Sequence, residues 1–139
     1  MTGRVVLEVP AKPEFLLLAR LAATGVGRSA GASEEAIADL KLAVTEAVAN
    51  AVRHAYPPGE PGTVTIELKS AGGRLEIVVS DTGKGLGDGD PSPVGVAAGE
   101  SGMGLSIIRA IADDDVDLGA GADGRGTRIR FACSLADES

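Results

Sequence analysis

The stretch SEEAIADLKLAVTEAVANAVRHA, residues 33–55, predicts a long helix packed on a sheet. Ser33 has the position of an N-cap, and the two glutamates after it suit the positive end of the helix dipole. Apolar residues recur at three- and four-residue spacing, which one face docked on a sheet requires. The other face carries Glu46 and Asn50, one helical turn apart. The apolar stripe consists of Ile37, Leu40, Val44, Val48 and Ala51.

On both sides of this helix, the spacing of apolar residues predicts further strands and helices. We expect Gly25, Gly27 and Gly31 to break the chain after the first helix. Between Thr82 and Gly102, seven glycines and two prolines indicate a long mobile lid instead of a regular element. The predicted strands are 4–9, 63–69, 74–80, 115–118 and 127–134, the second and third forming a hairpin, and the predicted helices are 14–24, 34–55 and 103–112.

Composition favours a single compact domain over residues 1–139 with an aliphatic core. With two Phe, one Tyr and no Trp, a base-stacking surface is not expected. The net charge of -7 repels nucleic-acid phosphates and anionic membranes, so we expect a protein partner, no direct nucleic-acid contact and no membrane association. A single cysteine, Cys133, and an N-terminus without the pattern of a secretory signal favour a cytoplasmic location.

Glu46 and Asn50 provide the side chains of a metal and proton-transfer site. Residues four apart on a helix project from the same face, with Cβ atoms about 5 to 6 Å apart. An Asn carbonyl oxygen suits Mg²⁺, which completes its coordination with phosphate oxygens and water. Glu46 would orient or deprotonate an attacking hydroxyl. The competing interpretation is a solvated polar stripe, because most Glu and Asn side chains on helices only face water.

Two glycine-rich turns offer complementary parts of a nucleotide site. Asp81 ends an apolar strand, and a carboxylate there can accept a hydrogen bond from the amino group of adenine. Gly83 and Gly85 would let the backbone approach the base closely. Gly102 and Gly104 open the last helix, where free N–H groups and the helix dipole attract phosphates. Taken singly, the first turn is also an ordinary strand ending, and a lone glycine repeat is weak support for nucleotide binding.

Four ordered segments resemble the motifs of the GHKL, or Bergerat-fold, ATPases. Among these the chain is most similar to the small anti-sigma factor serine kinases of bacterial stress and sporulation switches. Residues 45–55 resemble the asparagine box, 79–85 the first glycine box and 99–105 the second. Residues 124–127 resemble the final motif of the family, and 10–14 its opening between the first strand and the first helix.

The resemblance implies an α+β fold, a two-layer α/β sandwich in which helices cover one face of a mixed β-sheet and ATP lies between the layers. It implies that Glu46 is the general base and that Asn50 binds Mg²⁺. It also implies an anti-sigma factor that sequesters a sigma factor as a homodimer and phosphorylates a serine of an anti-anti-sigma antagonist. The nucleotide-binding residues that it implies are Asn50, Asp81, Gly83, Gly85, Gly102, Gly104 and Thr127.

Glu100 departs from the pattern of the family. Several relatives carry a basic residue just before Ser-Gly-Met-Gly, whereas an acid there would repel a γ-phosphate unless it points to solvent. A non-catalytic regulator, in which ATP only sets the shape that grips a partner, therefore stays open. The ATP-binding part of a sensor histidine kinase is less favoured, because His54 lies inside the asparagine box and not on a separate helical hairpin.

Overall fold

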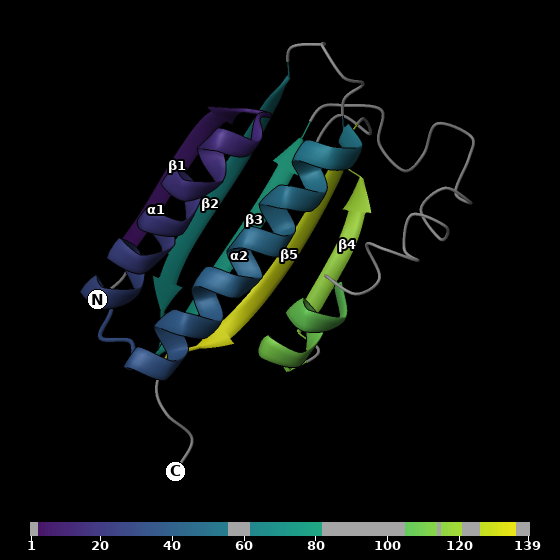
Figure 1. Ribbon diagram of the computed structural model, residues 1–139. Helices are drawn as coiled ribbons and strands as arrows, with labels where there is room; N and C mark the ends of the chain where they lie inside the picture. The colour runs from purple at the N-terminus through teal and green to yellow at the C-terminus, as the bar shows by residue number, and fades with distance from the viewer. Residues whose placement is uncertain (1–2, 56–61, 82–104, 114, 121–125, 136–139) are drawn as a thin grey trace.

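The computed structural model describes residues 3–55, 62–81, 105–113, 115–120 and 126–135. Its elements follow the predicted order along the chain (Figure 1), and residues 105–111 are helical. The predicted lid lies outside the described residues. The strands are β1 (Gly3–Pro10), β2 (Thr63–Ala71), β3 (Arg74–Asp81), β4 (Val116–Ala120) and β5 (Thr127–Ser134), and the helices are α1 (Leu16–Ser29), preceded by the 3-10 turn η1 (Pro13–Phe15), and α2 (Glu34–Ala55).

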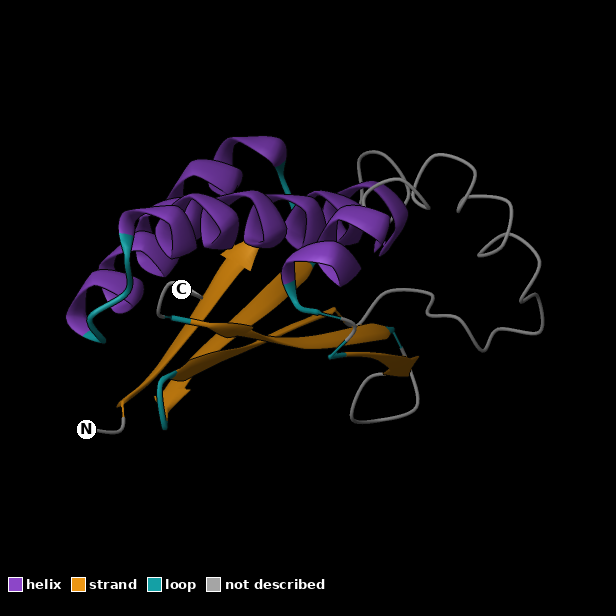
Figure 2. Ribbon diagram, turned by 90° about the horizontal axis from the view of Figure 1, so that it is seen from below, coloured by secondary structure: helices purple, strands orange, loops and turns teal. Residues whose placement is uncertain are grey.

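The described strands form one sheet in the order β1-β2-β3-β5-β4, and the helices cover only one of its faces (Figure 2). The predicted two-layer α+β fold is confirmed. Every neighbouring pair of these strands is antiparallel, however, so the expectation of a mixed sheet is wrong. The reason is the place of β5: β3 and β4 run in the same direction, but β5 lies between them, so no parallel pair forms.

Helix α2 forms as its residues predict. The backbone N–H of Ala36 donates to Ser33 Oγ at 3.0 Å, which confirms the N-cap. The N–H of Ser33 in turn donates to the carbonyl oxygen of Leu135 at 2.9 Å, which ties the start of α2 to the end of β5. Ser33 therefore caps α2 and also fixes the start of this helix against the end of the sheet.

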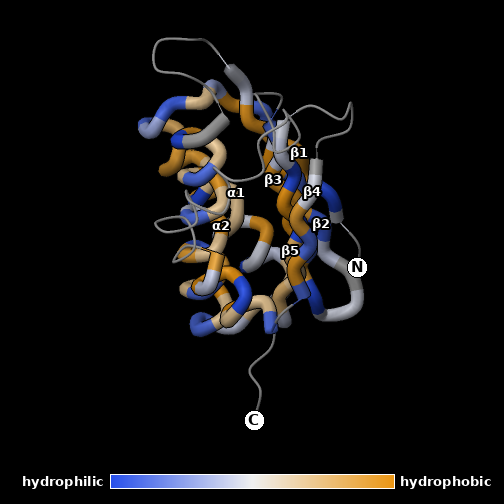
Figure 3. Tube along the Cα trace, turned by 90° about the vertical axis from the view of Figure 1, so that its right-hand side faces the viewer, coloured by the Kyte–Doolittle hydropathy of each residue, from blue (hydrophilic) through white to orange (hydrophobic). Residues whose placement is uncertain are grey.

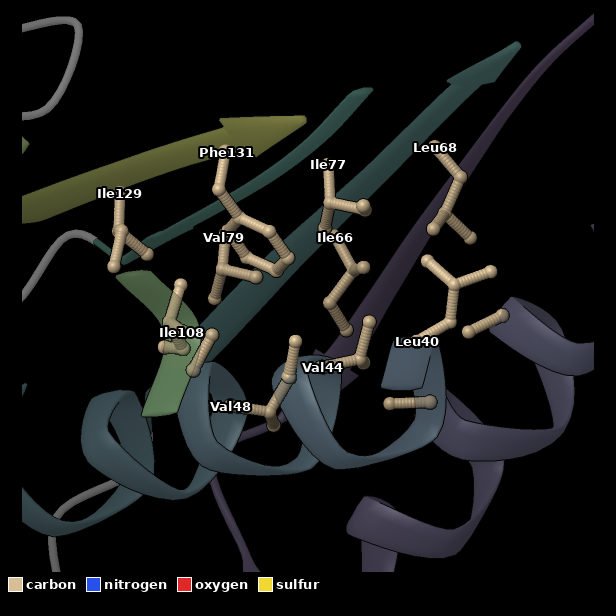
Figure 4. Close-up of a cluster of buried hydrophobic side chains, with 14 of the residues drawn as sticks. Leu40, Val44, Val48, Ile66, Leu68, Ile77, Val79, Ile108, Ile129 and Phe131 are labelled. Carbon is tan, nitrogen blue, oxygen red and sulfur yellow. The ribbon is translucent and has the colours of Figure 1, made fainter. Parts of the chain in front are cut away.

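α2 lays its apolar stripe on the middle of the sheet (Figure 4). Hydrophobic and hydrophilic residues alternate along the strands (Figure 3), and every second residue of β3 is buried. Because close-packed interiors leave few voids, burial of these side chains favours one position of the helix on the sheet. The largest fully buried side chains are Leu40, Val44 and Val48 of α2, Val64, Ile66 and Leu68 of β2, Leu75, Ile77 and Val79 of β3, Ile108 and Phe131.

The face of the sheet without helices carries a charge network centred on Arg130. Its guanidinium donates to Glu76 at 2.7 Å, to Asp115 at 2.9 Å and to Asp117 at 3.0 Å. Arg74 also donates to Asp115, at 2.8 Å. The hydrogen bond from Arg130 holds the pKa of the Asp115 carboxyl below its ordinary value. These charges satisfy one another across β3, β5 and β4, as expected of a face in contact with water.

α1 is longer than predicted: it continues through Gly25 and Gly27 and ends at Ser29. A Cβ at Gly27 would lie 3.1 Å from Leu40 Cδ1, so the missing side chain lets α1 approach α2 closely. Gly25 has no neighbour within 4 Å of the same position. The break falls at Gly31, whose φ of +85° is the left-handed conformation that glycine adopts at no steric cost.

This difference between the two helical glycines predicts opposite effects on stability. Gly25→Ala is expected to raise the free energy of unfolding by about 0.5–1 kcal/mol, because alanine is the better helix former and nothing stands in its way. Gly27→Val is expected to lower it by about 1–3 kcal/mol through overpacking against Leu40. Urea denaturation of the three proteins measures both values. Equal shifts for the two variants would contradict the close α1–α2 contact.

Two further findings concern the helices and the single cysteine. None of the described helices is long and apolar enough to cross a membrane. Cys133 is a free, buried thiol on β5, and burial raises its pKa to about 11. The thiol is therefore protonated at neutral pH and packs as a small apolar side chain.

Candidate functional site

The predicted acid and amide share one side of the second half of α2. Glu46 and Asn50 are both half-buried, and buried Ala47, Val48 and Ala51 lie among them on the helix. A fully solvated stripe would leave both side chains exposed, as are Glu34 and Glu35 at the start of the same helix. The partial burial of the pair favours a recessed polar position next to the core.

The side-chain oxygen of Asn50 already attracts a cation. Arg53, exposed and one turn further along α2, donates from Nη2 to Asn50 Oδ1 at 2.6 Å. Sequence reasoning missed this partner, although the three-residue spacing on a helix was visible and is the kind that brings side chains together. The contact orients the amide so that its carbonyl oxygen points to positive charge. An Mg²⁺ ion at this oxygen would have to displace the guanidinium.

Asp81 lies at the end of β3 and is only 5% exposed. Its Oδ1 accepts a hydrogen bond from the backbone N–H of Thr127 at 3.2 Å. β3 and β5 are neighbours whose last pair is Ser80 with Arg128, so the contact follows from the register of the sheet. The structure therefore brings together two of the predicted adenine-binding residues, from segments 46 positions apart.

The two predicted halves of the site lie at one end of the sandwich. Figure 1 shows the C-terminal end of α2, the end of β3 and the start of β5 at this same end. The other predicted residues, Gly83, Gly85, Gly102 and Gly104, lie outside the described residues, as does Glu100. Their part in the site stays a prediction.

The residues present are chemically suited to Mg-ATP. Asn50 offers the hard carbonyl oxygen that Mg²⁺ accepts, and the ion takes few protein ligands when phosphates supply the rest. Asp81 is a buried carboxylate with one oxygen tied to the backbone, which fixes the direction of the other. These groups stand at one end of a two-layer sandwich in which helices cover one face of an antiparallel sheet.

Comparison with known proteins identifies the family of this chain. The chain belongs to the histidine kinase-like ATPase domain family, whose match covers residues 9–133. The matched range includes Glu46, Asn50, Asp81 and Thr127, so the four described candidate residues all lie within the domain.

Among curated proteins, the chain is similar to bacterial serine-protein kinases. The chain is 46% identical over 83 residues to the serine-protein kinase RsbW of Listeria innocua, covering 60% of this chain and 53% of that protein. It is 45% identical over 78 residues to the serine-protein kinase RsbW of Oceanobacillus iheyensis, covering 56% of this chain and 49% of that protein. The chain thus spans about half the length of these relatives.

A solved structure has the same fold. The RsbU and RsbW domains of Rv1364c from Mycobacterium tuberculosis match 96% of this chain with a TM-score of 0.71. The aligned residues are 21% identical and make up 32% of that longer chain, so the likeness concerns the fold alone.

Proposed function

We propose that this chain binds Mg-ATP and is a serine-protein kinase and anti-sigma factor. In this proposal it phosphorylates a serine of an anti-anti-sigma antagonist and, when not so engaged, sequesters a sigma factor. The observation that carries the proposal is the half-buried pair of Glu46 and Asn50 on α2, at the same end of the fold as Asp81. The similarity to proteins named serine-protein kinase RsbW supports it.

The nucleotide would be held by residues from both layers and from both glycine-rich turns. Asp81 accepts the hydrogen bond of the adenine amino group, and Thr127 assists by holding Asp81 in place. Gly83 and Gly85 form the wall against the base, and Gly102 and Gly104 present backbone N–H groups to the phosphates. Asn50 gives one oxygen to Mg²⁺, which when bound neutralises charge on the transferring phosphoryl group.

Glu46 would act on the hydroxyl of the incoming serine. Its carboxylate accepts the hydroxyl proton while the serine oxygen bonds to the γ-phosphorus and the bond to ADP breaks. Partial burial suits this role, because a carboxylate shielded from water holds a fixed orientation relative to the metal ligand one turn away. Phosphoryl transfer depends mainly on such positioning.

The partners and the location are part of the same proposal. The net charge of -7 favours a protein partner with a basic patch over a nucleic acid or an anionic membrane. We place the protein in the cytoplasm, as a homodimer in which residues 1–139 of each copy form one domain. Incubation with ATP, Mg²⁺ and the cognate antagonist should yield antagonist phosphorylated on serine. Absence of phosphoserine with an antagonist that binds the chain would contradict the kinase assignment.

Glu100 favours a second candidate, a non-catalytic regulator of the same fold. An acid close to the γ-phosphate would slow transfer by repulsion without preventing nucleotide binding. This candidate predicts association with a partner that depends on ATP and yields no phosphoprotein. Measuring association and phosphorylation in the same samples separates the two functions. The third candidate, the ATP-binding part of a sensor histidine kinase, would instead transfer phosphate to histidine.

Substitution of Asp81 tests whether this residue binds the adenine of ATP. Asp81→Asn keeps an oxygen for the N–H of Thr127 but can replace the other carboxylate oxygen with an NH₂ donor, which opposes the adenine amino group. The affinity for Mg-ATP is expected to fall by about 10- to 100-fold, since a hydrogen bond to a charged group contributes about 1.5–3 kcal/mol. Calorimetric titration measures the change. Asp117→Asn, an exposed carboxylate on β4, is the control and should bind as the unchanged chain does.

A further inference from the structure

α2 carries a second row of apolar and small side chains, on the side turned away from the sheet. Leu40 and Val44 point toward the sheet (Figure 4). Leu42 lies midway between them in the sequence and therefore about 160° away around the helix axis, and it is 45% exposed. Spacings of four, three and four residues place this row along one side of the helix. The row, which we call the outer stripe, consists of Ala38, Leu42, Thr45 and Ala49.

The outer stripe presents apolar atoms to its surroundings. Ala38 and Leu42 are exposed, and Thr45 and Ala49 are half-buried. The hydroxyl of Thr45 donates to the carbonyl oxygen of Lys41 at 2.6 Å, so the one polar side chain of the stripe is satisfied within the helix. What Thr45 offers to a partner is its methyl group. A partner can therefore cover the stripe without stranding a polar side-chain group.

Glu46, the proposed general base, lies beside the outer stripe. Leu42 precedes it by four residues and Ala49 follows it by three, and both spacings bring Cβ atoms on a helix to about 5–6 Å. A single exposed leucine on a protein surface needs no explanation. Leu42 differs from such a residue because it belongs to an apolar row that borders the place where the serine must arrive.

A protein substrate that reaches Glu46 has to approach from the side of Leu42. The nucleotide and its metal ion take the side of Asn50, one turn further along the helix. A helical segment with its side chains is about 10–12 Å across, which exceeds the distance of about 5–6 Å from Glu46 to its neighbour one turn away. A segment that brings its serine to Glu46 therefore lies over Leu42, the only large apolar side chain of the outer stripe.

We infer that the serine-bearing segment of the antagonist docks on the outer stripe, with an apolar side chain next to the serine packed against Leu42. The inference rests on the proposed function and goes beyond it by naming the surface that recognises the protein substrate. It also names the chemistry that this surface selects. Glu46 acts on the hydroxyl while Leu42 binds the flanking residue, so a serine in a purely polar segment is a poor substrate.

Leu42→Gln tests this contact. Glutamine keeps a helix-forming side chain of similar length, but its amide would lose water against an apolar partner without gaining a hydrogen bond. The dissociation constant of the complex with the antagonist is expected to rise about tenfold. Calorimetry with Mg²⁺ and a non-hydrolysable ATP analogue measures it without transfer. Leu42→Met keeps an apolar side chain of similar volume and should bind within about twofold of the unchanged chain.

Leu118→Gln is the matched control. Leu118 is a leucine of almost the same exposure, 43%, on β4. The same chemical change there should leave the affinity for the antagonist unaltered. Equal affinities for Leu42→Gln and the unchanged chain would overturn the inference, as would equal losses in Leu42→Gln and Leu118→Gln.

The transfer assay separates docking from chemistry. Leu42→Gln should raise KM for the antagonist about tenfold and leave kcat within about twofold, because a contact made equally in the ground state and the transition state affects only binding. The affinity for Mg-ATP should not change, which also shows that the variant is folded. A fall in kcat at an unchanged KM would contradict a docking role for Leu42.

Photo-crosslinking identifies the segment that covers the stripe. Leu42→benzoylphenylalanine should form a covalent adduct with the antagonist on irradiation, and the crosslinked peptide should lie beside the serine that is phosphorylated. Leu118→benzoylphenylalanine should give no adduct. An adduct far from that serine, or none at position 42, would refute the docking surface.

The same measurements separate this inference from the proposed function. Phosphoserine formed by Leu42→Gln at the KM of the unchanged chain would refute the docking surface and leave the kinase proposal standing. Weaker association in Leu42→Gln, with no phosphoserine in any variant, would leave the docking surface standing and remove the kinase proposal.

Discussion

Glu46→Gln is expected to lower the rate of phosphoryl transfer to the antagonist by about 10²- to 10⁴-fold, the usual contribution of a positioned base. Glutamine keeps the size and the hydrogen-bonding oxygen of glutamate but cannot accept the serine proton. The affinity for Mg-ATP should stay within about twofold, because the general base does not hold the nucleotide. A radiolabelled transfer assay and a calorimetric titration on one preparation measure the two quantities.

Glu35→Gln is the matched control for this variant. It makes the same chemical change on the exposed first turn of the same helix, and it should transfer phosphate as fast as the unchanged chain. Equal rates for Glu46→Gln and Glu35→Gln would show that Glu46 is not the base. Loss of ATP binding in Glu46→Gln would instead give the residue a binding role.

Asn50→Ala is expected to weaken the binding of ATP in the presence of Mg²⁺ by about 100-fold or more, since even groups that only support a metal ligand affect affinity by about 10- to 100-fold. The variant removes the only oxygen of α2 assigned to the metal. In EDTA the two proteins should bind ATP with equal, weak affinity, because the metal no longer contributes. Titration with and without Mg²⁺ therefore isolates the role of the amide.

Arg53→Gln provides the control for the metal ligand. It frees Asn50 Oδ1 from the guanidinium that occupies it at 2.6 Å and leaves the amide in place. The concentration of Mg²⁺ needed for half-maximal ATP binding should stay the same or fall. An Asn50→Ala variant that responds to Mg²⁺ as the unchanged chain does would move the metal site elsewhere.

Local features of the fold followed from the sequence. The N-cap at Ser33, the buried stripe of α2 and the hairpin of β2 and β3 are set by residues close together in the chain, and all three form as predicted. The end of α1 did not follow from its residues. Glycine usually interrupts a helix, so Gly27 suggested the end of α1. Its close contact with Leu40 depends on α2, which lies later in the chain.

The arrangement of the strands required information that the sequence pattern does not contain. Alternation identifies a strand but not its neighbours, so the insertion of β5 between β3 and β4, and with it the antiparallel sheet, was not foreseen. The same long-range pairing places Thr127 against Asp81. Thr127 entered the prediction only through resemblance to a family, whereas Asp81 also followed from its position at a strand end. Arg53 was visible on the helix and was overlooked.

Isothermal titration calorimetry of the unchanged chain with Mg-ATP tests the central claim, that α2 and the end of β3 together bind one adenine nucleotide. The account predicts heat of binding at a single site per chain, and loss of most of that heat at the same concentrations in Asn50→Ala and in Asp81→Asn. No heat with ATP or ADP, or full binding in both variants, would contradict it.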